Sequence, residues 1–279
     1  MEKLLTILFF IFLFSCTNNS SLESTENIFN GDVNLITQAE VESFGSNNYT
    51  EITGELNIGG ANFGTDITNL EYLSSLNTVG SLYISLEGLI NFNGLHNLSA
   101  INGDFYIRSI NIDMENFNGL ESLSEINGDF RIVRSYFKNF IGLENLSINN
   151  GSLEIFSGYE LTSLSGLQLT TIGGDLRIIN CDLLTDLTGI ETLTSSNGNL
   201  IVQNNENLTS LYGLQNLLET NNVIIGGETE YGSSSPNESL ADFCDLTNLF
   251  TSGEFGSVTI TNNLYNPTSD DIINNNCSL

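Results

Sequence analysis

Carboxylates are the most numerous side chains in this chain that could do chemistry. The 279 residues include 34 aspartates and glutamates, a single histidine, His96, and four cysteines. Glycoside hydrolysis needs two carboxyl groups at a set separation, and no pair stands out by its spacing. A nucleophilic serine or cysteine needs a histidine as its base, but His96 lies in Gly94-Leu-His-Asn-Leu98, between apolar positions, and should face solvent. Because one histidine cannot form a multi-histidine metal site, the sequence predicts no catalytic residue, no metal site and no cofactor.

Three aspartates, Asp104, Asp129 and Asp175, share one recurring position immediately before a predicted strand. Carboxylates stacked in this way could hold calcium between neighbouring coils. Short polar side chains at such a position also cap turns by accepting backbone hydrogen bonds. The Gly-Gly-x-Gly-x-Asp repeat of calcium-binding β-rolls is absent, so we favour turn capping and leave calcium binding open.

The charge balance excludes one large class of partners. Six basic residues against 34 acidic ones give a net charge of −28, which repels nucleic acid and anionic lipid headgroups. With 40% hydrophobic residues the chain should nevertheless fold, and its many asparagines, serines, threonines and glycines indicate many short turns.

Residues 1–16, "MEKLLTILFFIFLFSC", read as an export signal. The apolar run Leu4–Phe14 is too short to cross a ~30 Å hydrocarbon core as a helix. Leu13-Phe14-Ser15-Cys16 resembles the lipobox of bacterial lipoproteins, which implies that Cys16 is acylated and becomes the new N-terminus. The alternative is an ordinary secretory signal with an incidental cysteine.

The residue after Cys16 bears on the destination. Thr17 stands where enteric lipoproteins retained at the inner membrane have aspartate, so the resemblance implies a lipid anchor in the bacterial outer membrane, on either side of it. The polar residues 17–31 are expected to form a flexible tether.

The elements that would position these side chains follow from a repeat. The pattern Gly-x-apolar-x-Ile/Val recurs seven times, at intervals of 23 to 26 residues. The matches are Gly54-Leu56-Ile58, Gly80-Leu82-Ile84, Gly103-Phe105-Ile107, Gly128-Phe130-Ile132, Gly151-Leu153-Ile155, Gly174-Leu176-Ile178 and Gly198-Leu200-Val202. Between them a second signature recurs, Phe/Leu-x-Gly-Leu/Ile, as in Phe92-Asn-Gly94-Leu95.

This spacing predicts a β protein built as a single solenoid. One coil of about 24 residues cannot bury enough core alone, so coils stack and share one. Strands of successive coils then pair in parallel, and we expect about nine coils in a right-handed parallel β-helix. The glycines should serve positive φ or close backbone approach.

The combined pattern, Leu-x-Gly-Leu-x-x-Leu-x-x-Ile-x-Gly-x-Leu-x-Ile, resembles the receptor L-domain family, which is related to leucine-rich repeats. The resemblance covers about residues 33–278, and the closing "NPTSDDIINNNCSL" resembles the end of secreted Bacteroidetes-type proteins with such repeats. It implies a β-helical ligand-binding module. Receptor ectodomains are disulfide-rich and this chain is not, so receptor biology is not carried over.

Both ends of a solenoid need caps. We assign residues 32–53 to an N-terminal cap, 54–225 to the repeats and 226–279 to a C-terminal loop and cap. Thr37 and Glu40 predict a capping box, with Gly45 ending that helix. In the C-terminal part the sequence predicts a polar loop over 226–238, a helix over 239–249, a last strand over 257–261 and a closing turn over 269–273.

The cysteines after Cys16 divide into a pair and a single residue. In an oxidising compartment Cys244 and Cys277, both in the C-terminal cap, are expected to form a disulfide, with two free thiols as the alternative. Cys181 is expected to be buried and inert.

The outward positions of the central strands form the candidate binding face, because side chains alternate along a strand. The candidates are Tyr83, Tyr106, Arg108, Arg131, Glu154, Phe156 and Arg177. The basic residues after the signal, Arg108, Arg131, Arg134, Lys138 and Arg177, all lie on or just after these strands. Aromatic and arginine residues are favoured at binding hot spots. The alternative is a cross-strand ladder with Glu154 between Arg131 and Arg177.

Three functions are compatible with the sequence. We favour a non-enzymatic, membrane-anchored binding module whose solenoid face contacts a protein or glycan. A structural coat protein without a small ligand is the second, and an enzyme or accessory subunit of polysaccharide processing is the third. An acidic cleft would favour an enzyme and a flat face would favour binding.

Overall fold

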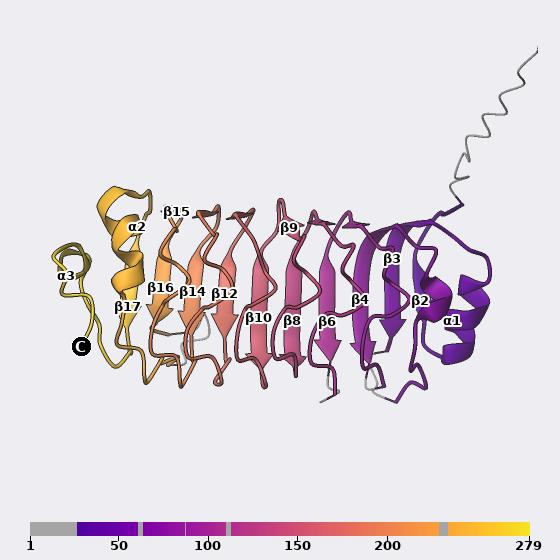
Figure 1. Cartoon of the computed structure of the whole chain (residues 1–279), viewed down its shortest axis with the longest axis horizontal. Coiled ribbons are helices and arrows are strands. Elements are labelled where there is room, and N and C mark those ends of the chain that lie inside the picture. The colour runs from indigo at the N-terminus through magenta and orange to yellow at the C-terminus, as the bar shows by residue number, and fades with distance from the viewer. Residues whose placement is uncertain (1–26, 61–63, 87, 110–112, 229–233) are drawn as a thin grey trace, which may run out of the picture.

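The computed structural model describes residues 27–60, 64–86, 88–109, 113–228 and 234–279. The chain winds into a β-solenoid of about eight turns, close to the nine expected, with a parallel sheet along its length and short helices at its ends (Figure 1). The predicted signal with Cys16, and most of the predicted tether, lie outside the described residues.

One row of strands forms what we call the front sheet. Each strand pairs in parallel with the equivalent strand of the next coil, and the apolar residues of the repeat stand opposite one another, as in Leu153↔Leu176 and Ile155↔Ile178. The strands are β2 (Val33–Leu35), β3 (Glu51–Gly59), β4 (Thr78–Leu86), β6 (Phe105–Ser109), β8 (Phe130–Ser135), β10 (Leu153–Gly158), β12 (Leu176–Ile179), β14 (Leu200–Gln203), β16 (Val223–Gly226) and β17 (Val258–Thr261).

A second row of short strands lies at the corner that precedes the front sheet. The residues just before each glycine pair in parallel there, and β3 and β4 are long enough to reach into both rows. The short strands are β1 (Ile28–Phe29), β5 (Ala100–Ile101), β7 (Glu125–Ile126), β9 (Ser147–Ile148), β11 (Thr171–Ile172), β13 (Ser195–Ser196) and β15 (Glu219–Thr220).

The core consists of stacked copies of the repeat's apolar positions. Phe92, Phe117 and Phe140, which begin successive Phe-x-Gly-Leu signatures, are fully buried and stack with ring centroids 5.8 and 5.3 Å apart. Phe105 and Phe130 stack in the same way at 4.9 Å. Identical residues at one repeat position therefore fill one column of the core, as the physics of stacked coils requires.

The N-terminal end differs from the expected boundaries. β1 and β2 both pair with β3, so the end of the predicted tether and the start of the predicted cap already belong to the solenoid. Helix α1 (Gln38–Gly45) has the predicted capping box of Thr37 and Glu40. Gly45 is the last helical residue rather than a left-handed stop, and it is needed because a Cβ there would lie 2.1 Å from the Tyr72 carbonyl oxygen of the 3₁₀ turn η1 (Glu71–Leu73).

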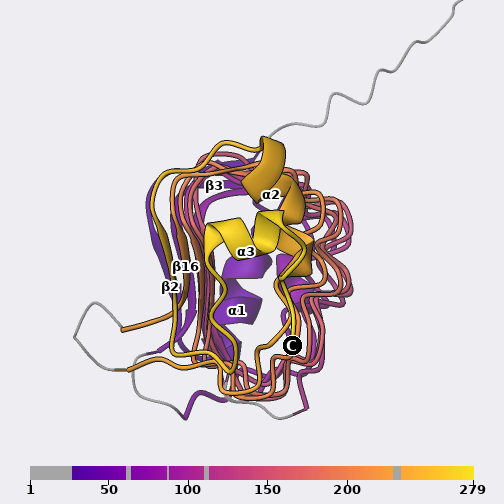
Figure 2. The same cartoon turned by 90° about the vertical axis from the view of Figure 1, so that its left-hand side faces the viewer.

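The C-terminal cap also departs from the expected helix over 239–249. The chain forms a 3₁₀ turn η2 (Cys244–Leu246) and only then α2 (Thr247–Ser252). The helix starts late because Asn237 and Asp242 form bridges with Asn263, Ser210 and Ser278. The last strand over 257–261 is confirmed as β17, and the closing turn is the short helix α3 (Ser269–Ile273), which lies across the end of the rod (Figure 2).

Candidate functional site

The aspartates before the strands cap the next coil, which confirms the favoured interpretation. Asp104 Oδ1 accepts from Asp129 N–H at 2.9 Å, and Asp129 Oδ1 accepts from Ser152 N–H at 2.8 Å. Asp175 Oδ1 accepts from the backbone and side-chain amides of Asn199, at 2.7 and 3.0 Å. One oxygen of each carboxylate is thus committed to the backbone of the following turn.

The position of these aspartate side chains explains why glycine recurs beside them. A Cβ on Gly128 would lie 2.2 Å from Asp104 Oδ1, and a Cβ on Gly198 would lie 2.3 Å from Asp175 Oδ1. Close approach is therefore the reason for the glycines before the strands. The corner glycines combine positive φ with close approach. Gly119 (φ +100°) and Gly189 (φ +118°) would place a Cβ 2.3 and 2.2 Å from the carbonyl carbons of Phe92 and Leu164.

Two tyrosines stack on the outward face of the front sheet. Tyr83 and Tyr106 are register partners on β4 and β6, their ring centroids are 5.3 Å apart, and both side chains are half-buried. Burial and the nearby carboxylates of Asp104 and Glu55 raise the pKa of Tyr83. Because the rings cover each other's faces, the pair presents mainly ring edges to a partner.

The next three residues of the same column form an ion ladder. Arg131, Glu154 and Arg177 are register partners on β8, β10 and β12. Glu154 accepts from Nε of Arg131 on one side, and its other oxygen lies 3.3 Å from Nε of Arg177. Its side chain is 8% exposed, against 43% for Arg131 and 31% for Arg177. The ladder that the sequence allowed is therefore present.

The capping aspartates Asp129 and Asp175 place two further carboxylates beside the arginines of this ladder. Arg177 bonds Asp175 Oδ2 at 2.6 Å, and Arg131 lies 3.7 Å from Asp129 Oδ2. Partial burial works against the charge of Arg131, but the hydrogen bond that it donates to Glu154 and the charges of Glu154 and Asp129 raise its pKa overall. Since both arginines face carboxylates, this part of the face is not a cationic site for an anionic ligand.

The adjacent outward column is mostly apolar. Val133, Phe156 and Ile179 are neighbours in register on β8, β10 and β12, and all three are half-buried. Arg108, earlier in this column, pairs in register with Ser85. All seven candidate residues of the binding face therefore lie on one side of the front sheet, as the alternation predicted. Lys138, on a turn, is paired with Glu115 instead.

A largely buried asparagine column, which the repeat pattern did not reveal, lies at the turn that follows the front sheet. Asn205 Oδ1 accepts from Cys181 N–H at 2.9 Å, and Asn237 Oδ1 accepts from Asn205 N–H at 3.0 Å. Asn263 continues the column by accepting from the Asn237 side chain at 2.9 Å. Asn205 is visible in the repeat alignment as the counterpart of Cys181, but Asn237 and Asn263 follow an insertion that hides their register.

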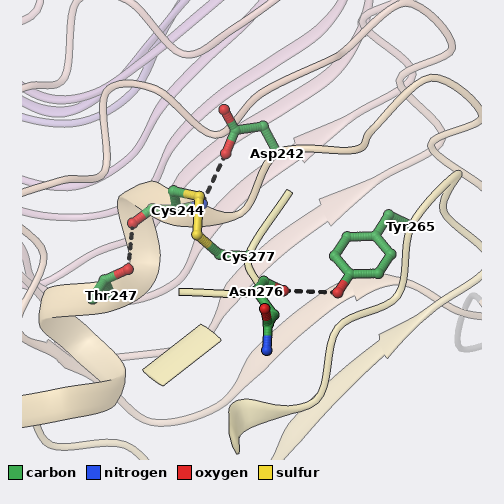
Figure 3. Close-up of a disulfide and its surroundings, with 6 residues drawn as sticks. All are labelled: Asp242, Cys244, Thr247, Tyr265, Asn276 and Cys277. Carbon is green, nitrogen blue, oxygen red and sulfur yellow. Dashed lines mark hydrogen bonds between the residues drawn. A yellow bond between two sulfur atoms is a disulfide. The ribbon is translucent and has the colours of Figure 1, made fainter. Parts of the chain in front are cut away.

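The remaining cysteines behave as expected. Cys181 is buried, and burial raises the pKa of its thiol to about 12. Cys244 and Cys277 form a disulfide that joins η2 to the last residues of the chain (Figure 3). Around it Asp242 accepts from Cys244 N–H, Thr247 donates to the Cys244 carbonyl, and Tyr265 donates to the Asn276 carbonyl.

His96 is exposed, as predicted. The pKa of Asp245 is raised by burial and by Asp242, but these carboxylates stand in the C-terminal cap beside the disulfide. Within the described ranges, no group of three or more histidine, cysteine or acidic side chains is placed to hold a metal ion, and no helix is long and apolar enough to cross a membrane. Comparisons of the chain with family models, with curated proteins and with solved structures find no match.

Proposed function

We propose that the protein is an exported binding module whose front-sheet face contacts a protein or glycan partner. One observation carries this proposal: Tyr83, Tyr106 and Phe156 are only half-buried and share one face of the front sheet, although the repeat buries the other apolar positions of these strands. We name the set Tyr83, Tyr106, Val133, Phe156 and Ile179 the front patch. Aromatic side chains on a rigid sheet provide contact area at low entropic cost.

The charge distribution supports the same face. The chain carries −28 overall, yet Arg108, Arg131 and Arg177 all lie on the front sheet, where Arg131 and Arg177 face the capping aspartates Asp129 and Asp175. For a neutral partner, the desolvation cost of binding is therefore lower on the front sheet than on the rest of the acidic surface. Arg131 and Arg177 are engaged in ion pairs on this face, and the apolar side chains supply the contact.

The proposal is tested by removing the aromatic edges without touching the ion ladder. The double variant Tyr83→Ser, Tyr106→Ser should abolish capture of envelope proteins and binding on a glycan array, with a small change in melting temperature. Tyr72 and Tyr212 are tyrosines away from the front sheet that are more exposed than Tyr83 and Tyr106, so Tyr72→Ser, Tyr212→Ser is the control. Equal capture by both double variants would refute a role for the front patch.

The anchor is a separate part of the proposal. We propose that Cys16 is acylated and holds the solenoid at the bacterial outer membrane, as the lipobox-like Leu13-Phe14-Ser15-Cys16 implies. Acylation by more than one chain would make this anchor stable. In a detergent phase-separation assay the wild-type protein should enter the detergent phase and Cys16→Ser the aqueous phase. An unchanged partition would refute the anchor and leave the front patch untouched.

A further inference from the structure

At the C-terminal end of the solenoid the front sheet ends at β17. Within the described part of the chain β17 pairs with β16 and with no strand beyond it. Val223 N–H donates to Ser257 O at 3.0 Å, and Gly227 N–H donates to Thr261 O at 2.8 Å. In a parallel pair, alternate residues turn their peptide groups to the same neighbour. The N–H and C=O groups of Val258 and Ile260 therefore point away from β16.

A groove of about 480 Å³ lies along this edge. One wall is β17 itself, and the other is the segment Asn266–Ser269 that leads into α3. No hydrogen bond among the described residues joins that segment to the peptide groups of Val258 or Ile260. The edge strand, Val-Thr-Ile-Thr, also has no lysine, proline or bulge, which are the features that usually protect an edge.

The lining of the groove is unusual for so acidic a chain. All eight residues that form it are uncharged: Val258, Thr259, Ile260, Thr261, Asn266, Pro267, Thr268 and Ser269. The groove at the opposite end, beside β2, contains Asp32 and Glu40. A neutral peptide backbone can therefore enter at β17 without facing a carboxylate in the lining.

We propose that this groove binds a single extended segment of another polypeptide, which adds to the front sheet as its next strand. The peptide groups of Val258 and Ile260 supply the hydrogen bonds. These groups are two residues apart, which is the interval at which an extended partner strand presents its own peptide groups to one neighbour. The net charge of −28 selects neutral or basic segments. A second folded copy does not fit, because it would bring its own Asn266–Ser269 wall against this one.

The test uses a synthetic peptide with the sequence of residues 197–204, Asn-Gly-Asn-Leu-Ile-Val-Gln-Asn. This segment is uncharged and contains β14, which already pairs within this sheet. A control peptide is N-methylated at Leu200, Ile201, Val202 and Gln203, which keeps the side chains and removes the amide donors. Binding of both to the full chain in detergent is measured by fluorescence anisotropy, and hydrogen exchange reports which amides the peptide protects.

The unmodified peptide should bind saturably, and the methylated peptide at least about tenfold more weakly, as expected for the loss of two or more hydrogen bonds. Exchange should slow at Val258 and Ile260 and stay unchanged at Thr259 and Thr261, whose amides already face β16. Val258→Pro removes one edge donor at a position where a sheet tolerates proline, and should weaken binding about tenfold. Val258→Thr, which keeps the donor, should bind within about twofold of wild type.

Three results would overturn this inference. The first is no saturable binding of the unmodified peptide, and the second is protection on strands other than β17. The third is concentration-dependent self-association that protects Val258 and Ile260 without peptide, because the occupant would then be a second copy. None of these results depends on Tyr83 or Tyr106, so they leave the proposed function of the front patch to its own test.

Discussion

Glu154 accepts a hydrogen bond from Arg131, its register partner on the neighbouring strand, and the two side chains differ strongly in exposure. The carboxylate is 8% exposed and the guanidinium 43%. A buried charge that loses a partner is destabilising, whereas an exposed charge loses little. The arginines therefore stabilise the ladder mainly by pairing with the buried carboxylate of Glu154.

Arg131→Gln should lower the free energy of unfolding by about 1–2 kcal/mol, because Glu154 would keep Arg177 as its only charged partner. Arg134, three residues further on in the same strand, is exposed. Arg134→Gln is the matched control and should change stability by less than about 0.5 kcal/mol. Urea unfolding followed by circular dichroism measures both, and equal losses would show that the ladder contributes nothing specific.

The corner glycines should be far less replaceable than a glycine in open space. At Gly119, with φ +100°, a Cβ would lie 2.3 Å from the Phe92 carbonyl carbon, so Gly119→Ala should destabilise the protein by at least about 1–3 kcal/mol. At Gly60 nothing lies within 4 Å of such a Cβ. Gly60→Ala should be neutral or stabilising by up to about 1 kcal/mol. Thermal unfolding of the two variants should separate them clearly, and similar melting temperatures would contradict the strained corner.

Breaking the Cys244–Cys277 disulfide should loosen the C-terminal cap before the repeats. The bond closes a loop over a separation of 33 residues, for which the chain-entropy model gives about 3–4 kcal/mol. In Cys277→Ser, hydrogen exchange should quicken first in η2, α2 and α3. Thiol counting on unfolded, unreduced protein lacking Cys16 should find one free thiol, that of Cys181, and a count of three would refute the bond.

The buried Cys181 thiol predicts a loss of stability at alkaline pH. Its pKa is raised from an ordinary value of 9.0 to about 12, so the folded state holds this proton more tightly than the unfolded state. The contribution is complete below pH 9 and is lost as pH rises from 9 to 12. Cys181→Ala should therefore lose less stability than wild type over that window, in denaturant titrations at several pH values. A parallel decline in both proteins would show that another group titrates there.

The sequence determined the architecture because the solenoid is a nearly one-dimensional structure. Each coil contacts only its neighbours, so the period of glycines and leucines already specified which residues stack and which side of each strand is buried. For the same reason the sequence predicted the order of the outward column correctly, as Tyr83, Tyr106, Arg131, Glu154 and Arg177. The boundaries at both ends were less accurate, because there the repeat is degenerate and β1, β2 and the bridges of Asn237 are formed by contacts outside its pattern.

The tertiary structure alone decided what the repeated polar residues do. A recurring aspartate is compatible with several roles, and only the tertiary structure shows that one oxygen of each carboxylate accepts a hydrogen bond from the next coil's backbone N–H. The asparagine column joins residues 32 positions apart across an insertion, and the free peptide groups of Val258 and Ile260 follow from the way β17 meets β16. Such features depend on hydrogen-bond directions between segments, which side-chain periodicity does not encode.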